Sequence, residues 1–282
     1  MRLSLRTPLV LILVLFLAAS ASGKVLMDED FRQYEKGSAG TPTWKVQAGE
    51  WQVTDRGFTG ADCPGGFTAQ GAKAGEEGWA DYTLTVRFKV LSLGTDWKDG
   101  AWIGFRHKNP KNAYTLGFYR GRTFLNKISG GRMTGRENPL AMTGRSVREG
   151  RWHTVKIHAV GRKIAVYVDG KLLLAAEDND WNDSPPLESG GIVLGARRWP
   201  QAEGTTEVLF SRVKVETDGA LPEKAIEFIR EKQEKRARRR RVAAFVESQR
   251  KRNWSDAKRR VMALYEPGFG TPRVSGEWSG WR

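Results

Sequence analysis

A single cysteine, Cys63, occurs in the 282 residues, so no intramolecular disulfide can form. Packing alone must then stabilise the fold, which suits a large domain better than a small cross-linked module. Cys63 lies in the sequence DCPGG, where we expect a buried structural thiol rather than a nucleophile. The HExxH and phosphate-loop motifs are missing as well, and only three histidines are present. The sequence therefore gives no indication of a zinc protease or a phosphate-loop nucleotidase.

Long apolar runs are absent except near the N-terminus. There, two arginines precede an apolar run over residues 9–17, and Ala19-Ser20-Ala21 follows. This order is typical of a secretory signal peptide, and the run is shorter than the ~20 residues that a membrane-spanning helix needs. We therefore expect a signal peptide over residues 1–21, no integral membrane span, and a secreted, periplasmic or cell-surface protein.

The basic charge is concentrated in the C-terminal part of the chain. Residues 222–282 hold 17 Lys and Arg against 8 Asp and Glu, and the whole chain has a formal net charge of +15. Residues 223–252 contain no Gly or Pro and consist mainly of good helix formers. We expect a basic helical extension over residues 222–265, including a second, shorter helix capped at Ser255-Asp256, and an irregular tail over residues 266–282.

Residues 24–217 alternate apolar and polar side chains with a period of two. The clearest stretch is GRWHTVKIHAVGRKIAVYVDGKLLLA (150–175), which places Val155 and Ile157 on one face and contains the hairpin turn Asp169-Gly170. Many short segments of this kind, with no helical period and no fixed repeat, predict an all-β sandwich domain over residues 24–217. The candidate strands are Trp51–Val53, Asp81–Val90, Ala101–His107, Ala113–Tyr119, Thr123–Ile128, Trp152–Val160, Lys163–Val168, Gly191–Ala196 and Glu207–Val215.

The order of several motifs resembles the concanavalin A-like lectin/glucanase superfamily. They are DEDF (28–31), WKVQAGEWQV (44–53), DYTLTVRFKV (81–90), YTLGFYRGRTFLNKISGG (114–131) and SGGIVLGA (189–196). The resemblance implies a jelly roll of two antiparallel sheets. Within the superfamily, the sequence resembles secreted laminin-G-like domains and the 3-keto-disaccharide hydrolase-like family.

The second of these resemblances implies a glycoside hydrolase or lyase as an alternative function. That family usually has Phe-x-Arg at the end of one strand and Tyr-Glu-x-Gln on the next. Here Phe105-Arg106 keeps the first pattern, but Thr115 and Gly117 stand where Glu and Gln are expected. Both polar positions of the second pattern are therefore lost.

Paired carboxylates for glycoside hydrolysis are not indicated in the middle of any predicted strand. The acidic pairs at a spacing of two are Asp28/Asp30, Asp178/Asp180 and Glu216/Asp218. A lyase could instead use Arg106, His107, Tyr119 and Arg120 on adjacent strands. Because Arg106 and His107 are consecutive, however, they face opposite sides of a strand. The catalytic residues are unknown from the sequence, and non-catalytic binding is favoured.

No cofactor is expected, and calcium is the only metal that the resemblance raises. Asp30 resembles an acidic residue that many relatives use with a structural calcium ion near the N-terminus. Those relatives often add acidic residues on the last strand, where this chain has Ser211-Arg212. Calcium needs six or more oxygen ligands. The metal site is therefore also unknown from the sequence.

The outward side chains of the predicted strands form a candidate binding face. If Ile103 and Phe105 point into the core, their neighbours point outward, and glycines on the same strands leave room for a ligand. Aromatic rings can stack on the C–H faces of sugars, and Arg can donate paired hydrogen bonds to carboxylate or sulfate. The predicted ligand-binding residues are Trp102, Arg106, Thr115, Tyr119, Arg197 and Trp199.

The sequence thus predicts an exported jelly-roll protein that binds a carbohydrate, either a polysaccharide or an acidic glycan. One alternative is a glycosidase or polysaccharide lyase of the 3-keto-disaccharide hydrolase-like type. The other is a structural or interaction protein that acts through its basic tail, where the run KRARRRR (Lys235–Arg241) can contact a polyanion or a partner protein.

Overall fold

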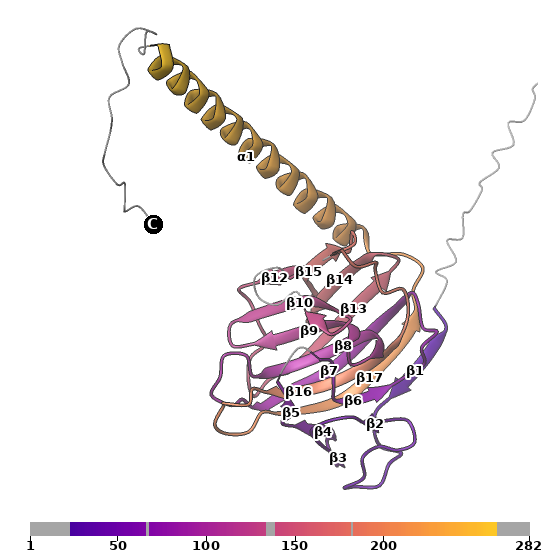
Figure 1. Cartoon of the computed structure of the whole chain (residues 1–282). Coiled ribbons are helices and arrows are strands. Elements are labelled where there is room, and N and C mark those ends of the chain that lie inside the picture. The colour runs from indigo at the N-terminus through magenta and orange to yellow at the C-terminus, as the bar shows by residue number, and fades with distance from the viewer. Residues whose placement is uncertain (1–22, 66–67, 134–138, 182, 264–282) are drawn as a thin grey trace, which may run out of the picture. The chain divides into compact units, whose positions relative to one another are not determined.

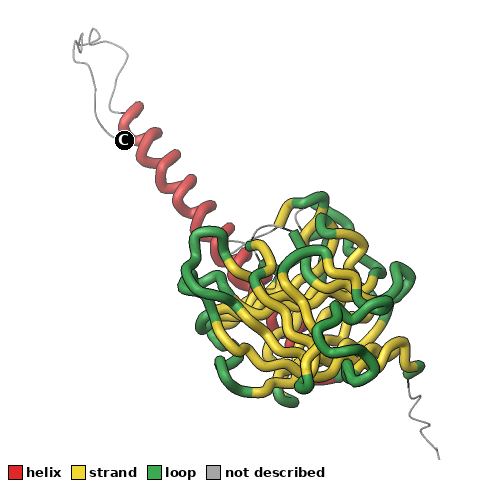
Figure 2. Tube along the Cα trace, turned by 90° about the horizontal axis from the view of Figure 1, so that it is seen from below, coloured by secondary structure: helices red, strands yellow, loops and turns green. Residues whose placement is uncertain are grey.

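Two β-sheets face each other and enclose the core of the protein (Figure 1, Figure 2). The computed structural model describes residues 23–65, 68–133, 139–181 and 183–263. The predicted signal peptide and irregular tail lie outside the described residues. Within them, all strand pairs are antiparallel except that of β5 with β16. The predicted all-β sandwich of two antiparallel sheets is therefore confirmed.

The first sheet has eight strands in the order β15-β14-β13-β7-β17-β4-β3, with β1 paired to β17. The bounds of its strands are β1 Val25–Glu29, β3 Glu50–Thr54, β4 Gly57–Ala61, β7 Tyr82–Ser92, β13 Trp152–Val160, β14 Lys163–Val168, β15 Lys171–Glu177 and β17 Glu207–Thr217.

The second sheet has nine strands in the order β11-β10-β9-β8-β16-β6-β2, with β12 paired to β10 and β5 to β16. The bounds of its strands are β2 Lys45–Val46, β5 Cys63–Pro64, β6 Ala72–Ala74, β8 Gly100–Asn109, β9 Asn112–Tyr119, β10 Arg122–Ser129, β11 Arg132–Met133, β12 Ala141–Thr143 and β16 Gly191–Arg198.

The period-two pattern of the sequence becomes the inner layer of the sandwich. On β13, Val155 lies opposite Val86 of β7 and Ile157 lies opposite Leu84, and all four side chains are fully buried. Full burial of each such side chain contributes about 1.5–3 kcal/mol. The hairpin between β13 and β14 turns at residues 161–162, and that between β14 and β15 turns at Asp169-Gly170, as the sequence predicts for the latter.

Cys63 is a structural residue, as expected. Its Sγ is buried and accepts a hydrogen bond from the backbone N–H of Ala196 at 3.5 Å. Burial raises the pKa of the Cys63 thiol to about 11, so the reactive thiolate is scarce at neutral pH.

One helix, α1 (Glu223–Ala263), follows the sandwich in the part of the chain that the structure describes. The predicted basic helical extension is thereby confirmed, but the shorter helix predicted to start at Ser255-Asp256 is wrong. Instead α1 continues through both residues, and Ser255 Oγ donates to the carbonyl of Arg252 at 2.8 Å, a bond that serine can make inside a helix. No described helix has both the length and the apolar content that crossing a membrane requires.

A polar cluster on the outer side of the first sheet predicts a pH-dependent contribution to stability. Asp218 accepts a hydrogen bond from Thr83 Oγ1, and its Oδ2 lies 2.6 Å from His158 Nδ1. Burial alone would raise the pKa of Asp218, but the bonds from Thr83 and His158 bring it below its usual value. A carboxylate with a depressed folded-state pKa stabilises the fold above its unfolded value of about 4, and this contribution is lost as the pH falls through the folded pKa.

We therefore expect Asp218→Asn to lower the Tm clearly at pH 7 and much less at pH 3, as measured by calorimetry. Asp180→Asn is the control, because the ion pair of Asp180 with Arg162 is exposed and long at 3.8 Å. An equal loss of Tm at both pH values would contradict the assignment.

Candidate functional site

Arg106 does not point outward from the second sheet, so this part of the sequence prediction is wrong. The register between β8 and β9 shifts after Phe105, and Arg106 has a φ of 44°. Such an irregularity breaks the alternation of faces and redirects the side chain. Arg106 is only 1% exposed as a result, and its guanidinium lies inside the sandwich.

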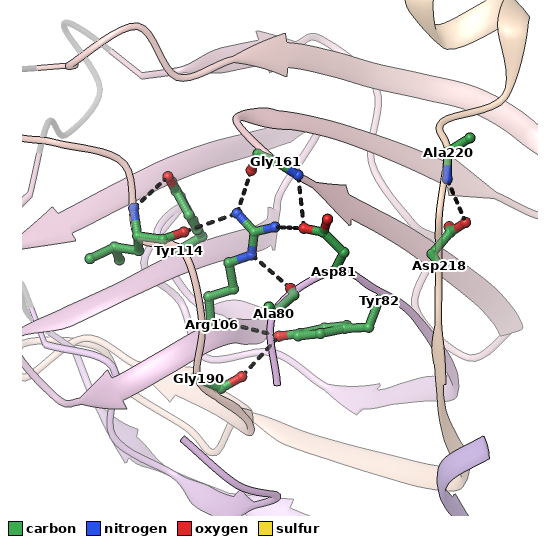
Figure 3. A network of polar contacts seen from close by, with 10 residues as sticks. Ala80, Asp81, Tyr82, Arg106, Tyr114, Gly161, Gly190, Asp218 and Ala220 are labelled. Atoms are coloured by element: carbon green, nitrogen blue, oxygen red, sulfur yellow. Dashed lines mark hydrogen bonds and ion pairs between the residues drawn. The ribbon is translucent and has the colours of Figure 1, made fainter. Parts of the chain in front are cut away.

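The guanidinium of Arg106 is held by protein groups on every nitrogen (Figure 3). Nη1 donates to the carbonyls of Gly161 (2.6 Å) and Leu187 (2.9 Å), and Nε donates to that of Ala80 (3.1 Å). Nη2 forms an ion pair of 2.9 Å with Asp81. Because these partners come from different segments, Arg106 ties one end of the sandwich together and is not available to a ligand.

His107, the neighbour of Arg106, is equally inaccessible. Its ring is fully buried, and Nε2 donates to the carbonyl of Ala69 at 3.0 Å. Burial lowers the pKa of His107 to about 4, so the ring is neutral at physiological pH. Neither Arg106 nor His107 can therefore reach a substrate as the lyase alternative would need.

The other predicted residues do lie together on the outer side of the second sheet. Trp102 of β8 pairs with Gly117 of β9 and with Gly195 of β16. In the next row, Gly100 lies between Tyr119 and Arg197. The strand register thus brings the predicted aromatic and cationic side chains together.

The centre of this face is nevertheless covered, which corrects the expectation of an open surface. Trp102, Thr115 and Arg197 are 1%, 3% and 4% exposed. Trp102 packs in a second apolar cluster with Ala69, which lies in the segment between β5 and β6 and bonds to the turn after β8. Ala69 thus covers part of the outer side of the sheet and contributes to a second, smaller core.

The space above the glycines is filled by the protein's own rings rather than kept for a ligand. A Cβ atom at Gly195 would lie 1.9 Å from Nε1 of Trp102, and one at Gly117 would lie 2.4 Å from the hydroxyl of Tyr119. Glycine is required at both positions because the rings lie flat against the backbone. The predicted role of these glycines in admitting a ligand is therefore wrong.

The accessible part of the face is at its end, where three connections meet. We call this group the Trp199 rim, and define it as Trp97, Lys98, Tyr119 and Trp199, with Arg197 beneath. Lys98 Nζ lies 3.8 Å from the centre of the Trp199 ring and 5.7 Å from that of Trp97. Trp97 is 38% exposed, and Tyr119 and Trp199 are half-buried.

Buried polar groups fix the rings of the rim in place. The backbone N–H of Trp199 donates to Oδ1 of Asp99 at 2.7 Å, and burial raises the pKa of this carboxyl above its usual value. Arg197 Nη1 donates to the hydroxyl of Tyr119 at 2.9 Å. The Arg197 Nε is buried without a hydrogen-bond partner, and among the described residues Arg197 makes no ion pair.

Trp97 and Lys98 were not predicted from the sequence. They lie in the loop LGTDWKD (93–99), which joins β7 to β8. A tryptophan in a loop rich in Gly and Asp is itself a signal, because such a large ring is seldom placed in a short polar connection without a contact. Sequence alone could not show that this loop meets the one after β16.

The described strands of this face carry no outward acidic side chain, although the buried Asp99 of the adjoining loop bonds to Trp199. No Asp or Glu is among the described outward positions of β8, β9, β10 and β16. These include Gly100, Trp102, Gly104, Ala113, Thr115, Gly117, Tyr119, Arg122, Phe124, Asn126, Ile128, Val193, Gly195 and Arg197. The described outward positions of these strands therefore do not supply a pair of carboxyl groups of the kind that glycosidases use.

The calcium site raised by the resemblance does not fit the side chains present. Asp30 does share a cavity with Ser211 and Arg212, but Arg212 brings a guanidinium there and pairs with Asp28 at 2.8 Å. The described residues contain no cluster of three or more His, Cys, Asp or Glu side chains that could hold a metal ion. Binding of a cation is disfavoured beside the positively charged guanidinium of Arg212.

The two facing antiparallel sheets define a β-sandwich domain. Residues 23–216 match the family described as the 3-keto-alpha-glucoside-1,2-lyase-like domain, and the chain belongs to this family. The match confirms the resemblance that the motif order indicates and covers the sandwich, not α1.

Among curated proteins, the chain is similar to an extracellular exo-alpha-L-arabinofuranosidase of Streptomyces chartreusis. The two are 26% identical over 174 residues, which is 60% of this chain but only 18% of the length of that relative. The similarity is therefore to one part of a much longer enzyme.

Among solved structures, the chain is similar to the carbohydrate-binding module CBM66 from Bacillus subtilis, with 17% identity and a TM-score of 0.46 over 64% of this chain and 99% of that one. It is also similar to domain 4 of AbnA, a GH43 extracellular arabinanase from Geobacillus stearothermophilus, solved with arabinotriose. That likeness has 13% identity and a TM-score of 0.44 over 71% of this chain and 95% of that one. At such identities the likeness concerns the fold alone.

Proposed function

We propose that the sandwich binds a carbohydrate through the Trp199 rim and does not itself turn the carbohydrate over. The observation that carries the proposal is the pair of half-exposed rings, Trp199 and Tyr119, which are held by Asp99 and Arg197. They lie at the edge of a face whose described outward strand positions hold no carboxylate. Fixed aromatic rings offer apolar surface to the C–H faces of a sugar. The adjacent cations are Lys98, which pairs with Asp96 at 3.8 Å, and the buried Arg197, and they suit a carboxylate or sulfate on the same sugar.

An enzyme is the second candidate, and membership of a lyase-like domain family favours it. Against it stand the loss of both polar positions at Thr115 and Gly117 and the burial of Arg106 and His107. Incubating the purified protein with a panel of glycosides and polysaccharides, followed by chromatography of the products, separates the two. Steady release of product would replace binding with catalysis as the function.

Export remains part of the proposal. The order of charges and apolar residues in the first 21 positions supports it, and we expect the N-terminal sequence of the mature protein to start close to Ser22. The exposed cationic side chains within Lys235–Arg241 of α1 support contact of this helix with a polyanion or a partner protein.

We expect Trp199→Ala to weaken binding of the best oligosaccharide from a glycan array about tenfold, since stacking on one fixed ring contributes about 1–1.5 kcal/mol. Isothermal titration calorimetry of the full chain measures this. Tyr119→Phe should cost less, because it removes only the hydroxyl that Arg197 contacts.

Trp254→Ala is the matched control, because Trp254 is 76% exposed on α1. Residues 226–282 form a compact unit separate from that of the sandwich, residues 1–225. Equal affinities of wild type and Trp199→Ala, with both proteins folded, would refute the role of the rim.

A further inference from the structure

The cavity shared by Asp30, Ser211 and Arg212 lies on the outer side of the first sheet, and its lining is mainly cationic, which does not suit a metal ion. It has a volume of about 730 Å³, within the range of about 300–1,000 Å³ that is usual for small-ligand sites. We call it the Arg87 groove. Its lining includes five cations, two carboxylates and three aromatic rings: Arg32, Lys36, Arg56, Arg87 and Arg212; Asp30 and Asp55; and Phe31, Tyr34 and Trp152.

Carboxylates pair with three of the five cations of the groove, and Arg212 is one of these because it pairs with Asp28. Asp55 pairs with Lys36, and Asp30 lies 3.7 Å from Nε of Arg32. Arg56 and Arg87 remain, and neither makes an ion pair with any residue in the described ranges. An uncompensated pair of guanidinium groups in a concave site favours an anion.

Arg87 is held in one orientation. Its guanidinium lies 4.1 Å above the centre of the Trp152 ring, and Nη1 donates to Ser211 Oγ at 2.9 Å. A planar guanidinium stacked on a ring keeps its remaining N–H groups in the plane of the fork, where they match a carboxylate or a sulfate. Ser211, as the acceptor of that bond, retains its own O–H for donation to the same anion.

A β-bulge places Ser211 in the groove. The register between β17 and β7 shifts between Phe210 and Arg212, so one residue of β17 is inserted. Phe210 and Val213 on either side are both in the core. The bulge therefore turns two consecutive side chains, Ser211 and Arg212, to the outer side, where both line the cavity.

The opposite wall of the groove is fixed by a buried carboxylate. Glu29 is 3% exposed, and its oxygens accept hydrogen bonds from the backbone N–H of Phe31 (2.6 Å) and the hydroxyl of Tyr34 (2.6 Å). Phe31 in turn stacks on Phe58 in the core, with ring centres 5.2 Å apart. A loop held in this way keeps its position without a ligand, which reduces the entropy lost on binding.

We propose that the Arg87 groove is a second binding site, on the opposite sheet from the Trp199 rim, for the carboxylate or sulfate of an anionic saccharide. The choice of a saccharide rests on the proposed function, whereas the preference for an anion rests on the groove alone. Two sites on opposite sheets would let one protein bridge two sugar chains.

The test measures binding to the full chain by titration calorimetry at 0.15 M NaCl. The probes are trigalacturonate for the carboxylate, a sulfated chondroitin disaccharide for the sulfate, and maltotriose as the neutral sugar. We expect Arg87→Gln to weaken binding of at least one anionic probe about tenfold and to leave that of maltotriose unchanged, because a charge-assisted hydrogen bond is lost.

Lys156→Gln is the matched control, because it removes one exposed charge from the same side of the first sheet without lining the groove. A triple variant, Arg239→Gln/Arg240→Gln/Arg241→Gln, controls for α1. Equal losses in Arg87→Gln and Lys156→Gln, a loss in the triple variant alone, or no binding of either anion would each overturn the proposal.

Failure here is distinguishable from failure of the rim. If the rim binds no sugar, Trp199→Ala leaves every affinity unchanged while Arg87→Gln still weakens the anionic probe. If only the proposal for the groove is wrong, Arg87→Gln leaves every affinity unchanged while Trp199→Ala still weakens sugar binding. Ser211→Ala, which keeps the charge and the fold, should give a smaller loss than Arg87→Gln for the anionic probe and none for the neutral sugar.

Discussion

Arg106→Met is expected to lower the free energy of unfolding by about 3 kcal/mol, because it leaves buried acceptors without donors and a carboxylate without its partner. Three carbonyls, those of Ala80, Gly161 and Leu187, lose their hydrogen bonds. The estimate stays at the lower end of the range for buried ion pairs, because the Asp81 side chain is 45% exposed and water can replace part of the loss. For a domain of this size the Tm should fall by about 6–12 °C.

Thermal and urea denaturation of the full chain measure this loss. Arg106→Lys should fall between wild type and Arg106→Met, because an ammonium group keeps the charge but cannot span the same four acceptors. Lys156→Met is the control, and as an exposed substitution it should change stability by no more than about 0.5 kcal/mol. A change as small as this in Arg106→Met would show that Arg106 does not hold the end of the sandwich together.

The role of Arg106 illustrates where the sequence was sufficient and where it was not. All nine predicted strands are present, and the alternation on β8 correctly puts Ile103 and Phe105 in the core. The prediction that Arg106 points outward failed, because an irregularity after Phe105 breaks the alternation of inward and outward side chains on β8. An inserted residue leaves no mark in a period-two pattern, since it depends on the register of the partner strand.

Other strands escaped prediction because they do not alternate. β15 has the sequence KLLLAAE, and β4 has GFTGA, in which four of five residues are buried. Strands covered on both sides read as short apolar runs that resemble any buried segment. The Trp199 rim was only half predicted for a similar reason. Tyr119 and Arg197 followed from strand parity, and Trp199 from its place in the loop after the strand. The loop contacts of Trp97 and Lys98, by contrast, depend on how distant connections meet.

The burial of the centre of the candidate binding face could not be predicted from the sequence, for a physical reason. Parity states on which side of a sheet a residue lies, but not whether another segment covers that side. Here Ala69, from the connection between β5 and β6, packs against Trp102 and Val193. A glycan can therefore reach the rim at the end of the face but not its middle, which is why the rim carries the proposed function.

Lys127→Met should be the most destabilising single change in the sandwich, with an expected loss of about 3–5 kcal/mol because it strands a buried charge. Lys127 and Asp178 are 1% and 0% exposed, and Nζ lies 2.8 Å from the Asp178 carboxylate. Lys127 also donates to the carbonyl of Ser184 at 2.6 Å, and Tyr114 donates its hydroxyl proton to Asp178 at 2.6 Å. Denaturation in urea, with the m-value compared to wild type, measures the loss.

The double variant Lys127→Met/Asp178→Asn separates loss of the pair from loss of packing. Removing both charges leaves no buried ion without a partner. The amide oxygen of Asn can still accept the bond from the backbone N–H of Trp181, and its NH₂ group can donate to the hydroxyl oxygen of Tyr114. We therefore expect the double variant to be more stable than Lys127→Met alone, with a coupling energy of about 2 kcal/mol or more. If the two single losses simply add, the carboxylate of Asp178 is solvated in the folded state and the pair is not a buried one.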